Sequence, residues 1–130
     1  IVYSEQTRVT ADTIDMQFND DTGTNYNWIA STDNAANAGA TAAAACRIVS
    51  GSDTNMWNFD FTTVNHIFLA KRIRGIGSGD NGGANQPRFV DTGCRWANTT
   101  AGITKVRIFT TGGTATFGAG TLINIWGSSQ

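Results

Sequence analysis

The last third of the chain alternates apolar and polar residues in two short runs, and this pattern constrains the fold more than any other feature. The runs cover residues 103–109 and 121–126, and a connection rich in glycine and threonine joins them. A period of two is typical of a β-strand, because successive side chains point to opposite faces of a sheet. We therefore expect these runs to form the closing hairpin of an antiparallel sheet.

Two earlier runs show the same alternation, at residues 13–19 and 55–62, and each predicts a strand with one buried and one polar face. Their apolar faces consist of Ile14, Met16 and Phe18, and of Trp57, Phe59 and Phe61. Residues 1–10 also begin as a strand. The mostly apolar residues 64–73 fit a strand that is buried on both sides. Residues 88–90 and 94–96 supply one further short strand.

Segments rich in glycine, asparagine and aspartate separate these runs. Residues 19–23 (Asn-Asp-Asp-Thr-Gly) predict a turn, after which Tyr26 begins the next strand. Residues 33–45 are ambiguous: alanine favours a short helix around residues 42–45, but a loosely ordered surface loop fits nearly as well. Residues 75–85 predict a long glycine-rich loop of the kind that often carries function.

The composition agrees with short strands joined by polar turns. Of the 130 residues, 40% are hydrophobic and only one is proline, so a single folded domain covering residues 1–130 is expected. The runs add up to roughly seven or eight strands, which favours an all-β antiparallel sandwich, jelly roll or barrel.

The charge balance argues against several classes of partner. Lysine and arginine total 9 and the acids total 10, and no basic stripe could neutralise a phosphate backbone, so we expect no nucleic-acid partner. No apolar segment approaches the roughly 20 residues that a membrane-spanning helix needs, so we expect no membrane insertion.

The two cysteines, Cys46 and Cys94, lack a CxxC spacing. A disulfide between them is one alternative, but we expect two free thiols, buried as small apolar groups.

No residue pattern predicts catalysis or a cofactor. Asn19, Asp20, Asp21 and Asp33 offer oxygen ligands, but the spacing of an EF-hand is absent, so turn stabilisation is the better interpretation. The only histidine, His66, has no acid or nucleophile at a recognisable spacing and is expected to be structural or at an interface. The glycines at 75, 77 and 79 lack the context of a phosphate-binding loop.

Two sets of residues remain as candidates for binding. Lys71, Arg72 and Arg74 form a basic cluster that suits an anionic partner, although a solvated face or an intersubunit ion pair fits better. The tryptophans at 28, 57 and 96 have polar neighbours, as in a sugar-binding platform, but core or interface packing is the more common use of tryptophan. We therefore keep carbohydrate binding as the alternative function.

Two segments resemble a known family. Residues 16–28, MQFNDDTGTNYNW, are similar to an N-G-D-T-G-x-N-Y segment of small β-rich domains from structural proteins of tailed bacteriophages. Residues 96–127 resemble the end of the same domains, with a tryptophan, an aliphatic strand, an F-x-x-G-[ST] motif and an aromatic–glycine finish. The chain departs from the family at Asp20, where glycine is usual, and at Trp126, where tyrosine is usual.

The resemblance implies a jelly-roll-like β-sandwich with a non-enzymatic role in the virion, as a capsid decoration or head fibre protein or as part of a tail fibre. It implies a homo-oligomer, with a trimer favoured, and contacts with capsid or tail proteins or with a host surface glycan. A third possibility, a hydrolase such as a capsule-degrading spike fragment, would need two facing carboxylates in a cleft.

This hypothesis assigns roles to specific residues. The structured turn comprises Asn19, Asp20, Asp21, Gly23 and Tyr26, and the core or interface anchors are Trp96, Phe117 and Trp126. The contact surface comprises Trp57, Lys71, Arg72, Arg74, Gly79 and Asp80. The chain begins at Ile1 and lacks the family's early segment, so we expect a processed or partial chain. That gap would leave the strand of residues 1–8 at an open edge, which a neighbouring subunit or virion protein would cover.

Overall fold

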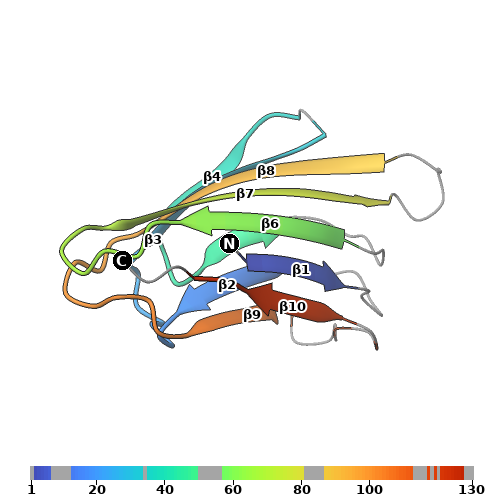
Figure 1. The fold of residues 1–130 in the computed structure, drawn as a ribbon. Helices are drawn as coiled ribbons and strands as arrows, with labels where there is room; N and C mark the ends of the chain where they lie inside the picture. The colour runs from blue at the N-terminus through green and yellow to red at the C-terminus, as the bar shows by residue number, and fades with distance from the viewer. Residues whose placement is uncertain are drawn as a thin grey trace.

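The computed structural model describes residues 2–6, 13–33, 35–49, 57–80, 87–112, 117, 119 and 121–127. These residues form ten β-strands (Figure 1). The strands are β1 (Val2–Gln6), β2 (Ile14–Phe18), β3 (Tyr26–Thr32), β4 (Ala38–Ala43), β5 (Cys46–Val49), β6 (Trp57–Thr63), β7 (Lys71–Asp80), β8 (Pro87–Trp96), β9 (Val106–Thr110) and β10 (Leu122–Ile125). Within this part of the chain, no helix is long and apolar enough to cross a membrane.

The strands pair into two antiparallel sheets. The large sheet has seven strands in the order β10-β1-β6-β7-β8-β3-β4, and the small sheet has three in the order β5-β2-β9. Strands β6, β7 and β8 follow one another and lie side by side (Figure 1). The predicted all-β antiparallel sandwich is confirmed, with ten described strands instead of the expected seven or eight.

The core lies between the two sheets. Phe18 of β2 meets Trp96 of β8 with ring centres 5.5 Å apart, and the Tyr26 ring lies 6.3 Å and 6.4 Å from these two, so the three rings form one cluster. Aromatic rings in such contact dominate the burial of apolar surface in a small domain. The buried residues that form the core cluster are Ile14, Met16, Phe18, Tyr26, Cys46, Ile48, Phe59, Phe61, Ile73, Val90, Cys94 and Trp96.

Glycines in β7 make room for the aromatic side chains of β6. Gly75 is the register partner of Phe61, and Gly77 is the partner of Phe59. A Cβ atom at these glycines would lie 2.4 Å and 2.2 Å from the two rings, far inside contact distance. The glycine-rich segment therefore belongs to a packed strand as far as Asp80, and the predicted loop over residues 75–85 is wrong for that part; residues 81–85 lie outside the described residues.

The predicted closing hairpin is also wrong. β9 pairs with β2 in the small sheet, whereas β10 pairs with β1 in the large sheet. Alternation identifies a strand but carries no information about its partner, so two consecutive strands could be separated without any change in pattern. β1 lies between β10 and β6, so for residues 2–6, the described part of the expected open edge at 1–8, the edge is covered within the chain.

Three other segments differ from the sequence prediction. Residues 64–70 form an exposed connection instead of a buried strand, and Phe68 is 72% exposed. Residues 38–43 form strand β4 instead of a helix or loop. β2 is buried on both faces, because Asp15 and Gln17 are covered by polar partners of neighbouring segments. Residues 88–90 and 94–96, from which one short strand was expected, are parts of the ten-residue strand β8.

The two cysteines form a disulfide, so the expectation of free thiols is wrong. Cys46 lies in β5 of the small sheet and Cys94 in β8 of the large sheet, with Cα atoms 5.9 Å apart. Both residues are buried in the core. The bond therefore joins the two layers from inside, a proximity that the sequence separation of 48 residues conceals.

Candidate functional site

The predicted turn at residues 19–23 binds the connection between β8 and β9, which is distant in the sequence. Asn19 and Asp20 have φ angles of 53° and 54°, and the N–H of Asp21 donates to the carbonyl of Phe18 at 2.9 Å. Two left-handed central residues make a tight turn of type I′, in which asparagine and aspartate are favoured. The Asn19 side chain accepts from the N–H groups of Thr104 (2.9 Å) and Lys105 (3.0 Å) and donates to the carbonyl of Gly102 (2.8 Å).

Asp21 connects this turn to the core. Its carboxylate accepts from the indole N–H of Trp96 at 2.7 Å and from the N–H of Gly23 at 2.9 Å. Burial raises the pKa of Asp21, but hydrogen bonds from Trp96, Asn25 and Gly23 outweigh it, so the pKa lies below its usual value. The Tyr26 hydroxyl, which accepts from the Phe18 N–H at 2.8 Å, has its pKa raised to about 12, mainly by burial.

Lys71 is part of this interior and not of a contact surface, which corrects the sequence prediction. Its side chain is 1% exposed, and the ammonium group donates to the carbonyls of Asn98 (2.8 Å) and Ala101. It also lies 5.1 Å from the centre of the Trp96 ring. Alternation along β7 places Lys71 on the same side as Ile73, facing inward, and sends Arg72 and Arg74 outward.

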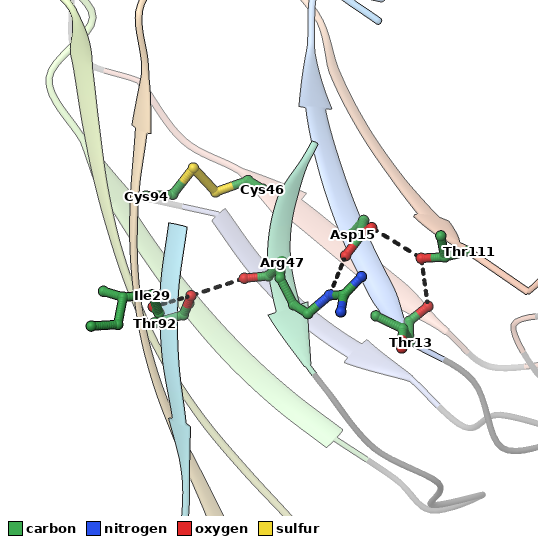
Figure 2. A network of polar contacts seen from close by, with 8 residues as sticks. All are labelled: Thr13, Asp15, Ile29, Cys46, Arg47, Thr92, Cys94 and Thr111. Atoms are coloured by element: carbon green, nitrogen blue, oxygen red, sulfur yellow. Dashed lines mark hydrogen bonds and ion pairs between the residues drawn. A yellow bond between two sulfur atoms is a disulfide. The ribbon is translucent and has the colours of Figure 1, made fainter. Parts of the chain in front are cut away.

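A second polar network crosses the sandwich beside the disulfide (Figure 2). The Arg47 guanidinium pairs with the Asp15 carboxylate at 3.2 Å, and the Thr111 hydroxyl donates to that carboxylate at 3.0 Å. The Thr92 hydroxyl of the large sheet donates to the Arg47 carbonyl at 2.9 Å. Arg47 also lies 4.9 Å from the centre of the Trp28 ring. These contacts stabilise the packing of the small sheet against the large sheet.

The outer face of the large sheet, directed away from the core, carries Arg72 and Arg74 of the predicted contact surface. Arg74 pairs with Asp91 at 3.3 Å, and both side chains are more than half exposed. Arg72 lies directly opposite Arg95 of β8, a residue that sequence reasoning missed because nothing local links the two strands. Gly79 lies in β7; the side chains of Trp57 and Asp80 lie outside the described residues.

The three predicted aromatic anchors occupy different environments. Trp96 is fully buried, and Phe117 is partly buried against the core. Trp126 is 58% exposed, so it is not a core residue, and its predicted role at an interface stays a prediction.

Two hollows lie on the outer face. One, of about 910 Å³, extends over β7, β8, β3 and β4, where Arg72, Arg95, Asn27 and Gly93 line it. The other, of about 420 Å³, lies beside Phe89 and Ile76, with Asp60 and Asp91 on its sides. Both fall in the size range of small-molecule sites.

The described residues contain no group of three or more histidine, cysteine, aspartate or glutamate side chains that could hold a metal ion. Asp33, one of the calcium candidates, accepts from the N–H of Phe89 at 2.9 Å and pairs with Arg88 at 2.7 Å. The Phe89 N–H is the main cause of a lowered pKa at Asp33. His66 lies in the exposed 64–70 connection, where its Nδ1 accepts from the Phe68 N–H at 3.1 Å.

The fold therefore defines the class of the protein as an antiparallel β-sandwich with two polar networks inside and a charged outer face. In comparisons with known proteins, no family model matches the chain, and neither a curated protein nor a solved structure matches it.

Proposed function

We propose that this chain is a non-enzymatic structural protein of a bacteriophage virion, a capsid decoration, head fibre or tail fibre component. It acts through association with copies of itself, with a trimer favoured, and with other virion proteins. The resemblance of residues 16–28 and 96–127 supports this class. The observation that carries the proposal is an exposed apolar margin on the large sheet.

This margin, the β10 margin, consists of Leu122, Ile123, Ile125 and Trp126, which are 50%, 43%, 59% and 58% exposed. β10 is the last strand of the large sheet, so one row of its backbone groups has no strand beside it within the described part of the chain. Edge strands are usually protected by charged residues or proline, because an open edge invites pairing with another chain. The sequence of the margin contains neither.

The register places part of this margin on the core side of the large sheet. Ile123 aligns through Ser4 with Phe59, and Ile125 aligns through Val2 with Phe61. Both phenylalanines are 2% exposed, whereas both isoleucines are more than 40% exposed. The small sheet therefore covers β6 but not β10. A neighbouring subunit that continues the core over β10 would bury these isoleucines, each worth about 1.5–3 kcal/mol when fully buried.

Light scattering of the purified chain at micromolar concentration tests the proposal. We expect an oligomer, or co-purification with capsid or tail, and we expect Ile125→Lys to shift the oligomer toward monomer. Ile76→Lys is the matched control, because Ile76 lies in the same sheet on its outer face and is 54% exposed. A stable wild-type monomer without a virion partner would falsify the proposal. Locating the chain in an intact particle separates decoration from fibre.

A further inference from the structure

Two arginines face each other on the outer face of the large sheet. Arg72 of β7 and Arg95 of β8 are direct register partners, and both are exposed. Side chains at such positions begin about 4.5–5.5 Å apart at Cβ, and like charges placed there destabilise a sheet. The pair, called the Arg pair below, therefore carries a repulsive cost in the isolated protein.

No carboxylate offsets this repulsion within the part of the chain that the structure describes. The ion pairs there are Asp15–Arg47, Arg74–Asp91, Arg88–Asp33 and Lys105–Asp20, and neither member of the Arg pair takes part. The next residue in the same row is Asn27 of β3, which is the register partner of Arg95. The row therefore combines two positive charges with an amide and contains no acid.

The Arg pair borders the hollow of about 910 Å³. Two glycines create this hollow, since Gly93 of β8 and Gly39 of β4 are the register partners of Ile29 on either side of β3. The absent side chains leave Ile29, 50% exposed, as an apolar surface between two depressions. Asn27 and Thr41 add polar groups to the same hollow.

We propose that this hollow binds an acidic saccharide, whose carboxylate sits between Arg72 and Arg95. Guanidinium groups bind carboxylates through paired, charge-assisted hydrogen bonds, and the bound anion would replace repulsion with attraction. The sugar ring lies over Gly93 against Ile29, and its hydroxyl groups face Asn27 and Thr41. This combination of an apolar surface with a few polar groups is typical of small-ligand sites.

The surroundings favour one small anion over a polyanion. Asp91 lies farther along the same face of β8, and Asp60 lies beyond it on β6, each a register partner of Ile76. These carboxylates would repel an extended chain of phosphates. The site is also separate from the β10 margin, because β1 and β6 lie between β10 and β7. The inference therefore goes beyond the proposed assembly role and can fail independently of it.

Isothermal titration calorimetry of the full chain with matched ligands tests the inference. The probes are sialyllactose against lactose, and oligogalacturonate against its methyl ester. We expect each acidic ligand to bind at least about tenfold more tightly than its neutral partner, because one good ionic contact is enough for a tenfold difference in affinity. No binding by either acid, or equal binding by the neutral partners, overturns the inference. Equal or tighter binding of a short oligonucleotide overturns it as well.

Substitutions locate the site. Arg72→Gln and Arg95→Gln should each weaken binding of the acidic ligand at least tenfold. Arg74 lies on the same strand and face as Arg72 but pairs with Asp91, so Arg74→Gln should change the affinity less than about twofold. Gly93→Val should block the hollow without strain, because a Cβ there lies 3.5 Å from Ile29. Arg95→Gln should also raise the melting temperature of the ligand-free protein, which a purely structural role for Arg95 would not do. Equal weakening by Arg74→Gln contradicts the assignment.

Discussion

Trp96 and Trp126 are both tryptophans, but one is buried and the other is mostly exposed. Trp96 lies in β8, inside the large sheet, where its indole is fully buried and its N–H donates to Asp21. Trp126 directly follows β10 at the open margin and is 58% exposed. Position in the sheet, and not residue type, separates an aromatic that is buried in the core from one that lies mostly exposed at the margin.

The largest expected effect comes from exchanging the two tryptophans for alanine, one at a time. Trp96→Ala removes a buried ring, the indole N–H that Asp21 accepts and the ring beside the Lys71 ammonium group, so we expect the free energy of unfolding to fall by about 3–5 kcal/mol. Trp126→Ala should change it by less than about 0.5 kcal/mol in the monomer but weaken self-association. Urea unfolding and light scattering measure the two quantities. Equal losses of stability would remove the distinction between the sites.

The next effect concerns the disulfide, which lies two residues from Trp96 in β8 and has no equivalent at the β10 margin within the described residues. We expect the Cys46→Ala/Cys94→Ala double variant to lose about 2–4 kcal/mol of unfolding free energy, because the open chain has more freedom when unfolded. Reductant should lower the stability of the wild type to a similar level and leave the double variant unchanged. A wild type whose unfolding midpoint ignores reductant would contradict the role of the bond.

The smallest effect is a pH dependence at the Trp96 site. Hydrogen bonds that lower the pKa of Asp21 stabilise the folded state above the ordinary carboxyl pKa of 3.8, and this contribution is lost as the pH falls through the lower folded value. Because Asp21 is partly exposed, we expect the contribution to be below about 1 kcal/mol. Unfolding midpoints between pH 7 and pH 2 should therefore fall more steeply for the wild type than for Asp21→Asn.

Trp96→Phe supplies the control for this pH effect, because it removes the indole N–H and keeps an aromatic ring. It should also make the unfolding midpoint fall less steeply with pH. The effects of Asp21→Asn and Trp96→Phe on this pH dependence should be less than additive, because both substitutions remove the same hydrogen bond. Fully additive effects would show that Asp21 and Trp96 act independently.

The sequence predicted those features that depend on neighbouring residues. Alternation located β2 and β6, and the run of asparagine and aspartate at residues 19–23 predicted a turn, which the positive φ angles of Asn19 and Asp20 bear out. These features follow from side-chain period and local backbone preference, which a short segment carries within itself.

The remaining features depend on the partner of each strand, which the sequence does not state. Lys71 looks like a surface residue until its carbonyl partners at Asn98 and Ala101 are known. The glycines of β7 suggest a loop in the sequence, and only the structure shows that the phenylalanine rings of β6 pack against them. The Arg pair is invisible in the sequence, because Arg72 and Arg95 are adjacent only through the register of β7 and β8.

The pairing of β1 with β10 has a consequence for the time course of folding. β1 is near the start of the chain and receives β10 as its neighbour only after more than a hundred residues have been made, with Val2 opposite Ile125. Contacts so distant in sequence form slowly, because a long loop must close before any strand pairing stabilises it. A nascent chain that stops before residue 122 would expose the backbone of β1, and synthesis of β10 is the step that closes that edge.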